Sequence, residues 1–208
     1  ATAVGLAAAG VLTVALKPSP VAATNILMNQ ESPYGQVKVL EQDHVRYLLI
    51  DGVSHSSFDT QTEESAHSYV DLLEALPWMI KNPERALVIG LGGGDLPKLF
   101  ERRYAMTVDS AEIDPVVVKA AREFFDFDQH QGEIRLWDGR RYVKSRPAHS
   151  YDFVIMDAFG ADRQPPHLAT QEFFGEVKKL LKPGGFLALN TIGFVQGQGY
   201  LPWENLCA

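Results

Sequence analysis

The sequence predicts an α/β protein in which helices cover both faces of a parallel sheet and a small β element precedes that sheet. Three observations support this prediction. From Ala86 onward, short apolar runs alternate with stretches of helical periodicity; the first such run ends in a glycine-rich turn; and the segment before residue 62 alternates apolar and polar residues. Parallel strands need crossover connections, so strict alternation of strand and helix indicates right-handed βαβ units.

The composition fits one globular domain with a small addition. Of the 208 residues, 46% are hydrophobic and 22% are charged, which is enough for one continuous core but not for two large domains. The net charge of −7 argues against a nucleic-acid partner. The single cysteine, Cys207, lies beside the C-terminus, so neither a disulfide framework nor a cysteine-based metal site is expected.

Residues 1–29 are expected to form an apolar segment followed by a polar joint. Residues 1–16 carry no charge, and as a helix they would extend about 24 Å, less than the roughly 20 residues that span a bilayer. Two interpretations stay open. The segment is either the end of a membrane helix or signal segment, or an Ala/Gly-rich helix lying on the domain.

A β element is expected over residues 30–62, and the main domain over residues 63–208. Alternating apolar residues on both sides of a polar turn predict a β-hairpin there; they are Val37, Val39, Val45, Tyr47 and Leu49. Apolar residues at spacings of three and four then predict one amphipathic helix over residues 63–80. The aromatic residues Trp78, Trp137, Phe124 and Phe125 are expected in the core.

Five apolar runs are expected to form the parallel sheet. They are Leu87–Ile89, Thr107–Glu112, Ile134–Trp137, Phe153–Met156 and Phe186–Leu189. The first run is followed by Gly90, Gly92, Gly93 and Gly94. Glycines at this place let the backbone approach a ligand, and the helix that follows points its free amides at that ligand.

Four acidic residues follow four successive strands: Asp95, Glu112, Asp138 and Asp157. Because the carboxyl ends of parallel strands meet at one edge, we expect these carboxylates to line one crevice. Each one could instead cap the helix after it. Glu112 lies 18 residues after Gly94, close to the spacing at which nucleotide-binding folds place an acid on ribose hydroxyls.

These features favour an adenosyl sulfonium ligand over NAD. The crevice would combine a glycine turn, a ribose acid and the Asp138–Gly139 pair for an adenine amino group, without a second phosphate-binding glycine motif. S-adenosylmethionine or a relative is therefore the expected ligand. Asp157 follows the strand expected at the centre of the cleft, which makes it the catalytic candidate.

Several motifs together resemble the spermidine synthase (polyamine aminopropyltransferase) family over residues 30–195. They are Glu31–Gln36, Ile50-Asp51-Gly52, Tyr69, Gly92–Asp95, Glu112-Ile113-Asp114 and Asp138-Gly139. Three further motifs resemble the bacterial spermidine synthase-like branch that is often fused to membrane helices: Met156–Phe159, Pro166–Thr170 and Pro183–Gly185. The resemblance implies a Rossmann-like S-adenosylmethionine-dependent transferase fold. It also implies a homodimer in the cytoplasm, with or without a tether to the inner face of the membrane.

The resemblance also implies an activity and residue roles. Members of the family transfer an aminopropyl group from decarboxylated S-adenosylmethionine to putrescine or a similar amine and release methylthioadenosine. Gln36 and Asp95 would contact the aminopropyl end of the donor, while Glu112 with Ile113 would hold the ribose. Asp138 with Gly139 would hold the adenine, and Asp157 would be the catalytic aspartate. Tyr69, His55 and Asp162 are the candidates for binding the acceptor amine.

The expected amine side departs from the family pattern. Ser65 and Ala66 stand where the family has an acidic pair, Gly160 replaces a second active-site aspartate, and His55 replaces a glutamine. Glu63, Glu64 and Asp162 are candidates to compensate. The chain after Leu189 is also short for the two terminal strands that the fold implies, so a truncated chain or a reduced sheet is expected.

Two other functions stay open beside aminopropyl transfer. One is a methyltransferase that uses intact S-adenosylmethionine on an unknown acceptor; the other is a non-catalytic adenosyl-binding module. Asp95 separates the first from the leading hypothesis, since its carboxylate would repel the carboxylate of the intact methionine tail. No His/Asp/Glu cluster has the spacing of metal ligands, so no metal is expected.

Overall fold

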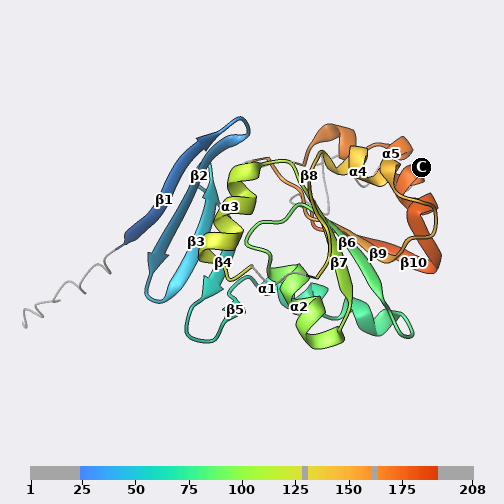
Figure 1. Ribbon diagram of the computed structural model, residues 1–208, viewed down its shortest axis with the longest axis horizontal. Helices are drawn as coiled ribbons and strands as arrows, with labels where there is room; N and C mark the ends of the chain where they lie inside the picture. Colours follow the sequence, from blue (N-terminus) through green and yellow to red (C-terminus); the bar gives the residue numbers. More distant parts are fainter. Residues whose placement is uncertain (1–23, 128–130, 161–163, 192–208) are drawn as a thin grey trace, which may run out of the picture.

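The computed structural model describes residues 24–127, 131–160 and 164–191. These residues form two sheets that lie side by side (Figure 1). The N-terminal sheet is antiparallel and has five strands; the second sheet is parallel and also has five. The mixed architecture, with helices against the parallel sheet, confirms the predicted fold class.

The N-terminal sheet joins its strands in sequence order. They are β1 (Asn25–Ser32), β2 (Gly35–Gln42), β3 (Val45–Ile50), β4 (Val53–Asp59) and β5 (Glu64–Ser65). Two-residue turns connect β2 to β3 and β3 to β4, because Gln42 pairs with Val45 and Ile50 pairs with Val53. Both turns have positive φ at both central residues, which matches the twist of paired strands. The sheet extends beyond the hairpin that the alternation predicts.

The parallel sheet has the strand order β10-β9-β6-β7-β8. Its strands are β6 (Arg85–Ile89), β7 (Thr107–Glu112), β8 (Ile134–Leu136), β9 (Tyr151–Met156) and β10 (Leu181–Leu189). The chain runs outward from β6 to β8, then crosses back to place β9 on the other side of β6. This reversal creates a switch point between β6 and β9, where the connections at the carboxyl ends diverge and leave room for a ligand.

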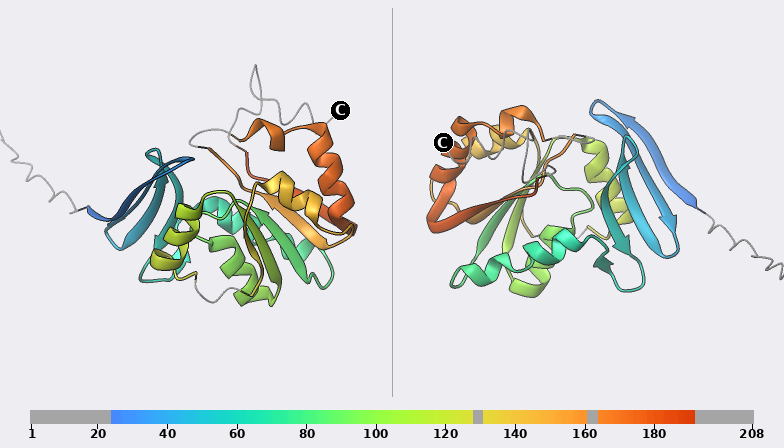
Figure 2. Two further views of the ribbon diagram at one scale, coloured as in Figure 1. Left: turned by 45° about the horizontal axis from the view of Figure 1, so that its top comes forward. Right: turned by 180° about the vertical axis from the view of Figure 1, so that it is seen from behind.

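Two helical layers cover the parallel sheet (Figure 2). The helical segments are α1 (Ser68–Leu73), η1 (Leu76–Met79), α2 (Asp95–Tyr104), α3 (Pro115–Phe124), α4 (Gly139–Ser145), η2 (Pro166–Leu168) and α5 (Gln171–Leu180). Residues of α4 and α5 pack on one face, and residues of α1 and α2 pack on the other. Leu87 and Ile89 face the first layer while Ala86 and Val88 face the second, as the period of two along a strand requires.

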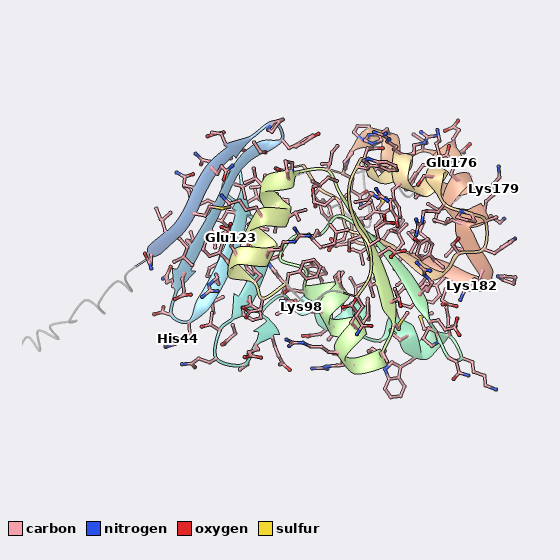
Figure 3. The ribbon with its side chains drawn as sticks, viewed as in Figure 1. His44, Lys98, Glu123, Glu176, Lys179 and Lys182 are labelled. Atoms are coloured by element: carbon pink, nitrogen blue, oxygen red, sulfur yellow. The ribbon has the colours of Figure 1, made fainter. Side chains whose placement is uncertain are left out.

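The two sheets share a core through α3. Val116, Val117 and Ala120 of α3 and the following Phe125 pack against Val37, Val39, Leu48 and Phe58 of the N-terminal sheet. Lys98 of α2 also reaches this boundary, where its ammonium lies 4.5 Å from the centre of the Phe58 ring (Figure 3). The N-terminal sheet is therefore held against the domain by burial of apolar side chains.

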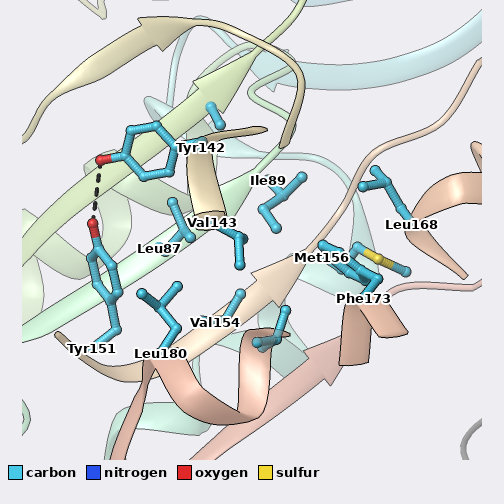
Figure 4. Packing of buried hydrophobic residues seen from close by; sticks show 12 residues of the cluster. Leu87, Ile89, Tyr142, Val143, Tyr151, Val154, Met156, Leu168, Phe173 and Leu180 are labelled. Carbon is cyan, nitrogen blue, oxygen red and sulfur yellow. Dashed lines mark hydrogen bonds between the residues drawn. The ribbon is translucent and has the colours of Figure 1, made fainter. Parts of the chain in front are cut away.

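The core under α4 and α5 contains a tyrosine pair (Figure 4). The hydroxyls of Tyr142 and Tyr151 lie 3.2 Å apart, and the Tyr151 hydroxyl donates to Asp109 Oδ2 at 2.6 Å. Arg85 and Arg146 pair with the same carboxylate at 2.7 Å and 3.3 Å. Asp109 is 1% exposed, so these donors compensate the cost of burying its charge.

The helix predicted over residues 63–80 is wrong in its extent. Residues 64–65 form β5, and the helical part is divided into α1 and η1. Pro77 lacks the N–H that a continuous helix would need at that place. The tighter turn packs Leu76 and Ile80 against the core but leaves Trp78 81% exposed, so Trp78 is not a core residue. Phe125 is buried as expected, and Phe124 and Trp137 are partly buried.

Some sequence predictions fall on residues that the structure does not describe. The uncharged run over residues 1–16, Asp162 and Cys207 lie outside the described residues. Across residues 24–127, 131–160 and 164–191, every helix is too short or too polar to span a bilayer.

Candidate active site

A cavity of about 550 Å³ lies at the carboxyl ends of β6, β7 and β9. Its opposite wall comes from the N-terminal sheet, through Tyr34, Ile50 and the start of β4. The cavity therefore lies at the switch point and is closed by both sheets. This volume is in the range of small-molecule sites.

The four strand-end carboxylates meet in this cavity. Asp95, Glu112, Asp138 and Asp157 all line it, so the structure brings together the residues that the strand-end pattern places at one edge. Other predicted site residues also line the cavity; they are Gly90, Gly92, Ile113, Gly139, Tyr69 and His55.

Three predicted site residues lie elsewhere. Gln36 is outside the cavity lining; its side-chain Nε2 donates to Glu31 Oε1 at 3.2 Å. Gly93 donates its backbone N–H to Ser56 Oγ at 2.8 Å, which fastens the glycine turn to β4. Gly94 begins α2 with a φ of 79°, a left-handed conformation that glycine adopts without strain. These two glycines shape the turn, and the donor contact of Gln36 that the resemblance implies stays a prediction.

The glycine turn passes between the two sheets with no space for a side chain at Gly90 or Gly92. At Gly90, where φ is 97°, a Cβ atom would overlap the backbone carbonyl of Asp157. At Gly92, where φ is 56°, a Cβ atom would lie 2.5 Å from Ser56 Oγ. Glycine is thus required for the conformation and also for the close approach of β4, β6 and the loop after β9.

Glu112 is buried and accepts two backbone hydrogen bonds. Leu91 N donates to Oε2 at 3.0 Å, and Asp114 N donates to Oε1 at 2.8 Å. Burial raises the pKa of Glu112 to about 7, while the backbone hydrogen bonds lower it. Each carboxylate oxygen keeps a second lone pair, so the side chain can still accept from a vicinal diol.

Asp157 is held from two sides. The Tyr69 hydroxyl donates to Oδ2 at 3.1 Å, and the Asn190 amide donates to Oδ1 at 2.8 Å. Burial raises the pKa of Asp157 to about 6, and the two hydrogen bonds counteract part of that rise. Asp157 is therefore mostly ionised at pH 7, and two donors orient its carboxylate.

Asn190 and Gln164 support this arrangement and were missed by the sequence reasoning. Asn190 directly follows β10 and lines the cavity. Gln164 is 3% exposed, and its Nε2 donates to the Asn190 backbone oxygen at 2.5 Å. The rule that placed the four acids, a polar residue after a parallel strand, would have found Asn190 had it been applied to amides.

Asp138 has two partners at the other end of the cavity. The His167 Nε2 lies 2.6 Å from Oδ2, and Arg141 N donates to Oδ1 at 3.0 Å, which caps α4. Burial alone would raise the pKa of Asp138, but these hydrogen bonds lower it below its ordinary value. Asp138 therefore caps a helix and lines the cavity at once, so the two interpretations of this residue are compatible.

Comparison with known proteins identifies the family. The sequence pattern of the spermine/spermidine synthase domain matches residues 66–195. The chain belongs to the spermine/spermidine synthase family. It is 33% identical over 190 residues to a polyamine aminopropyltransferase of Vibrio vulnificus, covering 86% of this chain and 64% of that protein. It is 32% identical over 171 residues to a spermidine synthase of Solanum lycopersicum, covering 79% and 46%.

Solved structures share the fold. Spermidine synthase from Thermotoga maritima superposes with a TM-score of 0.66 at 23% identity, covering 78% of this chain and 56% of that chain. A probable spermidine synthase from Corynebacterium glutamicum gives a TM-score of 0.71 at 22% identity, covering 85% and 65%. The chain spans 46% to 64% of the length of the two sequence relatives above.

Two histidines line the cavity of this member of the spermine/spermidine synthase family. His55 and His67 both line the cavity, and the His67 ring lies 5.6 Å from the Tyr69 ring. Burial lowers the pKa of each imidazole, so both are neutral at pH 7. Within the described part of the chain, His55 Nε2 is buried without a hydrogen-bond partner, which leaves it available to a bound group.

The candidate compensating acids line a different space. Glu63 and Glu64 face a second cavity of about 240 Å³, together with Ser65, Asp71 and Glu74. Asp95 lies between the two cavities and lines both. Within the described residues, Glu63 and Glu64 therefore do not line the larger cavity, whereas Asp95 and Asp157 do.

Proposed function

We propose that the protein transfers an aminopropyl group from decarboxylated S-adenosylmethionine to putrescine or a similar primary amine. The observation that carries this proposal is the pairing of two carboxylates in one cavity: Asp157, ionisable near pH 6 and held by Tyr69 and Asn190, and Glu112, buried and poised for a diol. Family membership supports it. A homodimer, implied by the family resemblance, stays a prediction. A membrane tether, suggested by the resemblance and by the uncharged run over residues 1–16, also stays a prediction.

The proposed donor would lie across the carboxyl ends of the strands. Glu112 would accept from the ribose hydroxyls, and Asp138 would accept from the adenine amino group. Asp95 would face the aminopropyl ammonium. The partly buried Tyr69 ring lines the cavity and would offer a π face to a bound cation. In these roles, three of the four strand-end acids would each face either a positive charge or hydrogen-bond donors of the ligand.

Asp157 would deprotonate and orient the acceptor. A primary amine with a pKa near 10.4 is neutral in only about one molecule in 2,500 at pH 7, which costs about 4.6 kcal/mol. Asp157 takes the ammonium proton, and the freed nitrogen lone pair attacks the carbon beside the sulfonium. The nitrogen–carbon bond forms as the carbon–sulfur bond breaks, and the electron pair goes to sulfur, giving neutral methylthioadenosine. Alignment of amine and carbon supplies much of the rate enhancement.

Product analysis by mass spectrometry tests the proposal. The protein is incubated with putrescine and either decarboxylated or intact S-adenosylmethionine. Methylthioadenosine and spermidine in the decarboxylated reaction are the expected products. Adenosylhomocysteine in the intact reaction would indicate a methyltransferase. No product from a panel of primary amines with either donor would contradict an enzymatic role and favour the adenosyl-binding module.

A further inference from the structure

Lys98 lies behind Asp95, on the side away from the donor cavity. Both residues are on α2, three positions apart, and Lys98 Nζ lies 3.5 Å from Asp95 Oδ1. Asp95 lines both cavities, whereas Lys98 lines only the smaller one. The Lys98 side chain is 14% exposed and the Asp95 side chain is 9% exposed, so this ion pair is largely buried. A carboxylate of the proposed donor site thus has a cation of its own.

Two further contacts fix the Lys98 ammonium at this place. Nζ donates to the Phe125 backbone oxygen at 2.6 Å and lies 4.5 Å from the centre of the Phe58 ring. Figure 3 shows Lys98 at the boundary between α2 and the N-terminal sheet. These contacts and the ion pair with Asp95 therefore hold the ammonium between α2 and the N-terminal sheet.

A cation held beside Asp95 changes how strongly this carboxylate favours one donor tail over the other. The decarboxylated donor ends in an ammonium alone, whereas the intact donor ends in an ammonium and a carboxylate. A carboxylate without a paired cation would attract the ammonium of the decarboxylated donor and would repel the carboxylate of the intact donor. A cation 3.5 Å away cancels part of that field, and burial strengthens the cancellation because little water screens it. Among the described residues, His67, Tyr69 and Asp157 are further titratable groups that interact with Asp95.

We propose that Lys98 sets how strongly the cavity discriminates between decarboxylated and intact S-adenosylmethionine, by offsetting the charge of Asp95. Lys98 is a positioning and specificity residue that acts through Asp95 without touching the donor. The proposal rests on the proposed function for the identity of the donor class. It predicts weaker selection against the methionine carboxylate than Asp95 alone would give.

Calorimetric titration with the two donors tests the proposal without any turnover. The measured quantity is the ratio of the Kd for intact donor to the Kd for decarboxylated donor. Lys98→Met and Lys98→Gln both remove the charge, and glutamine keeps a donor for the Phe125 oxygen. Each should raise the ratio about tenfold, equivalent to about 1.4 kcal/mol. Removing the cation should strengthen ammonium binding and weaken carboxylate binding.

Matched variants separate this effect from general ones. Lys98→Arg keeps the charge and should keep the ratio of the wild type. Lys182→Met makes the same change in net charge at the start of β10, where Lys182 pairs with Asp152 at 3.0 Å (Figure 3), and should also keep the ratio. An unchanged ratio in either folded neutral variant overturns the proposal.

A reciprocal variant covers the case in which neither neutral variant folds. Asp95→Asn leaves Lys98 unopposed, so the cavity should then favour the tail that carries a carboxylate. A ratio below one supports the proposal, and a ratio of one or more overturns it. Failure of the proposed function would appear separately, as absent methylthioadenosine from wild-type protein that still binds the donors with a Lys98-dependent ratio.

Discussion

At the scale of single residues, the environment of Asp157 balances two requirements of a proton acceptor. Burial raises its pKa from 3.8 to about 6, which brings it about 2 pKa units nearer to an alkylammonium and saves about 2.7 kcal/mol in the proton transfer. A greater rise would leave the carboxyl protonated at pH 7. The hydrogen bonds from Tyr69 and Asn190 prevent this by stabilising the ionised form.

Asp157→Asn should abolish transfer and preserve donor binding. The amide can still accept from Asn190 and donate to the Tyr69 oxygen, so the cavity keeps its shape, but it cannot take a proton. We expect kcat to fall by at least about 100-fold, with the Kd for decarboxylated S-adenosylmethionine changed by less than about threefold. Initial rates and calorimetry measure the two quantities. Glu123→Gln removes an exposed charge on α3 (Figure 3) and serves as the control. Turnover at the wild-type rate in Asp157→Asn would refute the assignment of Asp157 as the proton acceptor.

Tyr69→Phe should move the acid limb of the pH profile to higher pH. In the wild type, with both substrates far below saturation, log(kcat/KM) should rise with a slope of one below about pH 6 and level off above it. The amine enters as its ammonium and Asp157 must be ionised to take the proton, so the slope is lost once Asp157 is ionised. Phenylalanine removes a hydrogen bond that lowers the pKa of Asp157, so the break should move to higher pH. A break that stays in place would show that Asp157 is not the titrating group.

The sequence could predict this site only where topology determines position. Asp95, Glu112, Asp138 and Asp157 follow parallel strands, and that rule alone places them together. Gln36 was assigned by resemblance, and it lies outside the cavity because its position depends on how the N-terminal sheet docks. No local pattern encodes that docking.

At the scale of elements, the glycine turn after β6 packs against three segments: the loop after β9, strand β4 and the residue that follows α3. Gly90 contacts the Asp157 backbone, Gly92 approaches Ser56, and Gly93 lies against Phe125. In the same turn, the backbone N–H of Leu91 donates a hydrogen bond to Glu112 Oε2. A shift of this turn would therefore move the proposed ribose site and the backbone of the catalytic candidate together.

Gly90→Ala should destabilise the protein by about 2–5 kcal/mol, from the strain of a positive φ and the overlap with the Asp157 carbonyl. Urea unfolding measures this change. Gly175→Ala is the matched control, because it lies in α5 with no atom within 4 Å of the added Cβ. It should stabilise the protein by about 0.5–1 kcal/mol through helix propensity. Equal effects of the two substitutions would contradict a steric role for Gly90.

The elements themselves were predictable to different degrees. β7 has the predicted bounds and β6, β8 and β9 lie within two residues of theirs, whereas β10 begins five residues before the predicted run. Apolar residues dominate β6 and β9, as expected of strands buried on both faces. The 63–80 segment shows why periodicity alone fails. Its apolar spacing suits one helix, but Pro77 divides the segment, and pairing with β4 draws residues 64–65 into a strand.

At the scale of the whole molecule, the cavity exists only because two sheets are held together. The parallel sheet supplies Glu112 and Asp157, while the N-terminal sheet supplies Tyr34 and His55. Their shared core around α3 is apolar, and Ser32 Oγ reinforces it by donating to Asp114 Oδ2 at 2.5 Å. A ligand that fills the cavity contacts both sheets and should stabilise them as one unit.

Methylthioadenosine, the expected product, should therefore protect both sheets from hydrogen exchange. At a concentration of 100 times its Kd, binding should add about 2.7 kcal/mol to the stability of the bound state. Amides that exchange only through global unfolding should then exchange about 100-fold more slowly, in β3 as well as in β6. Hydrogen exchange followed by mass spectrometry measures both peptides in one experiment. Glu112→Gln weakens the proposed ribose contact and should reduce protection in both sheets together at the same ligand concentration. Protection confined to the parallel sheet would show that the N-terminal sheet opens independently and that the cavity does not couple the two.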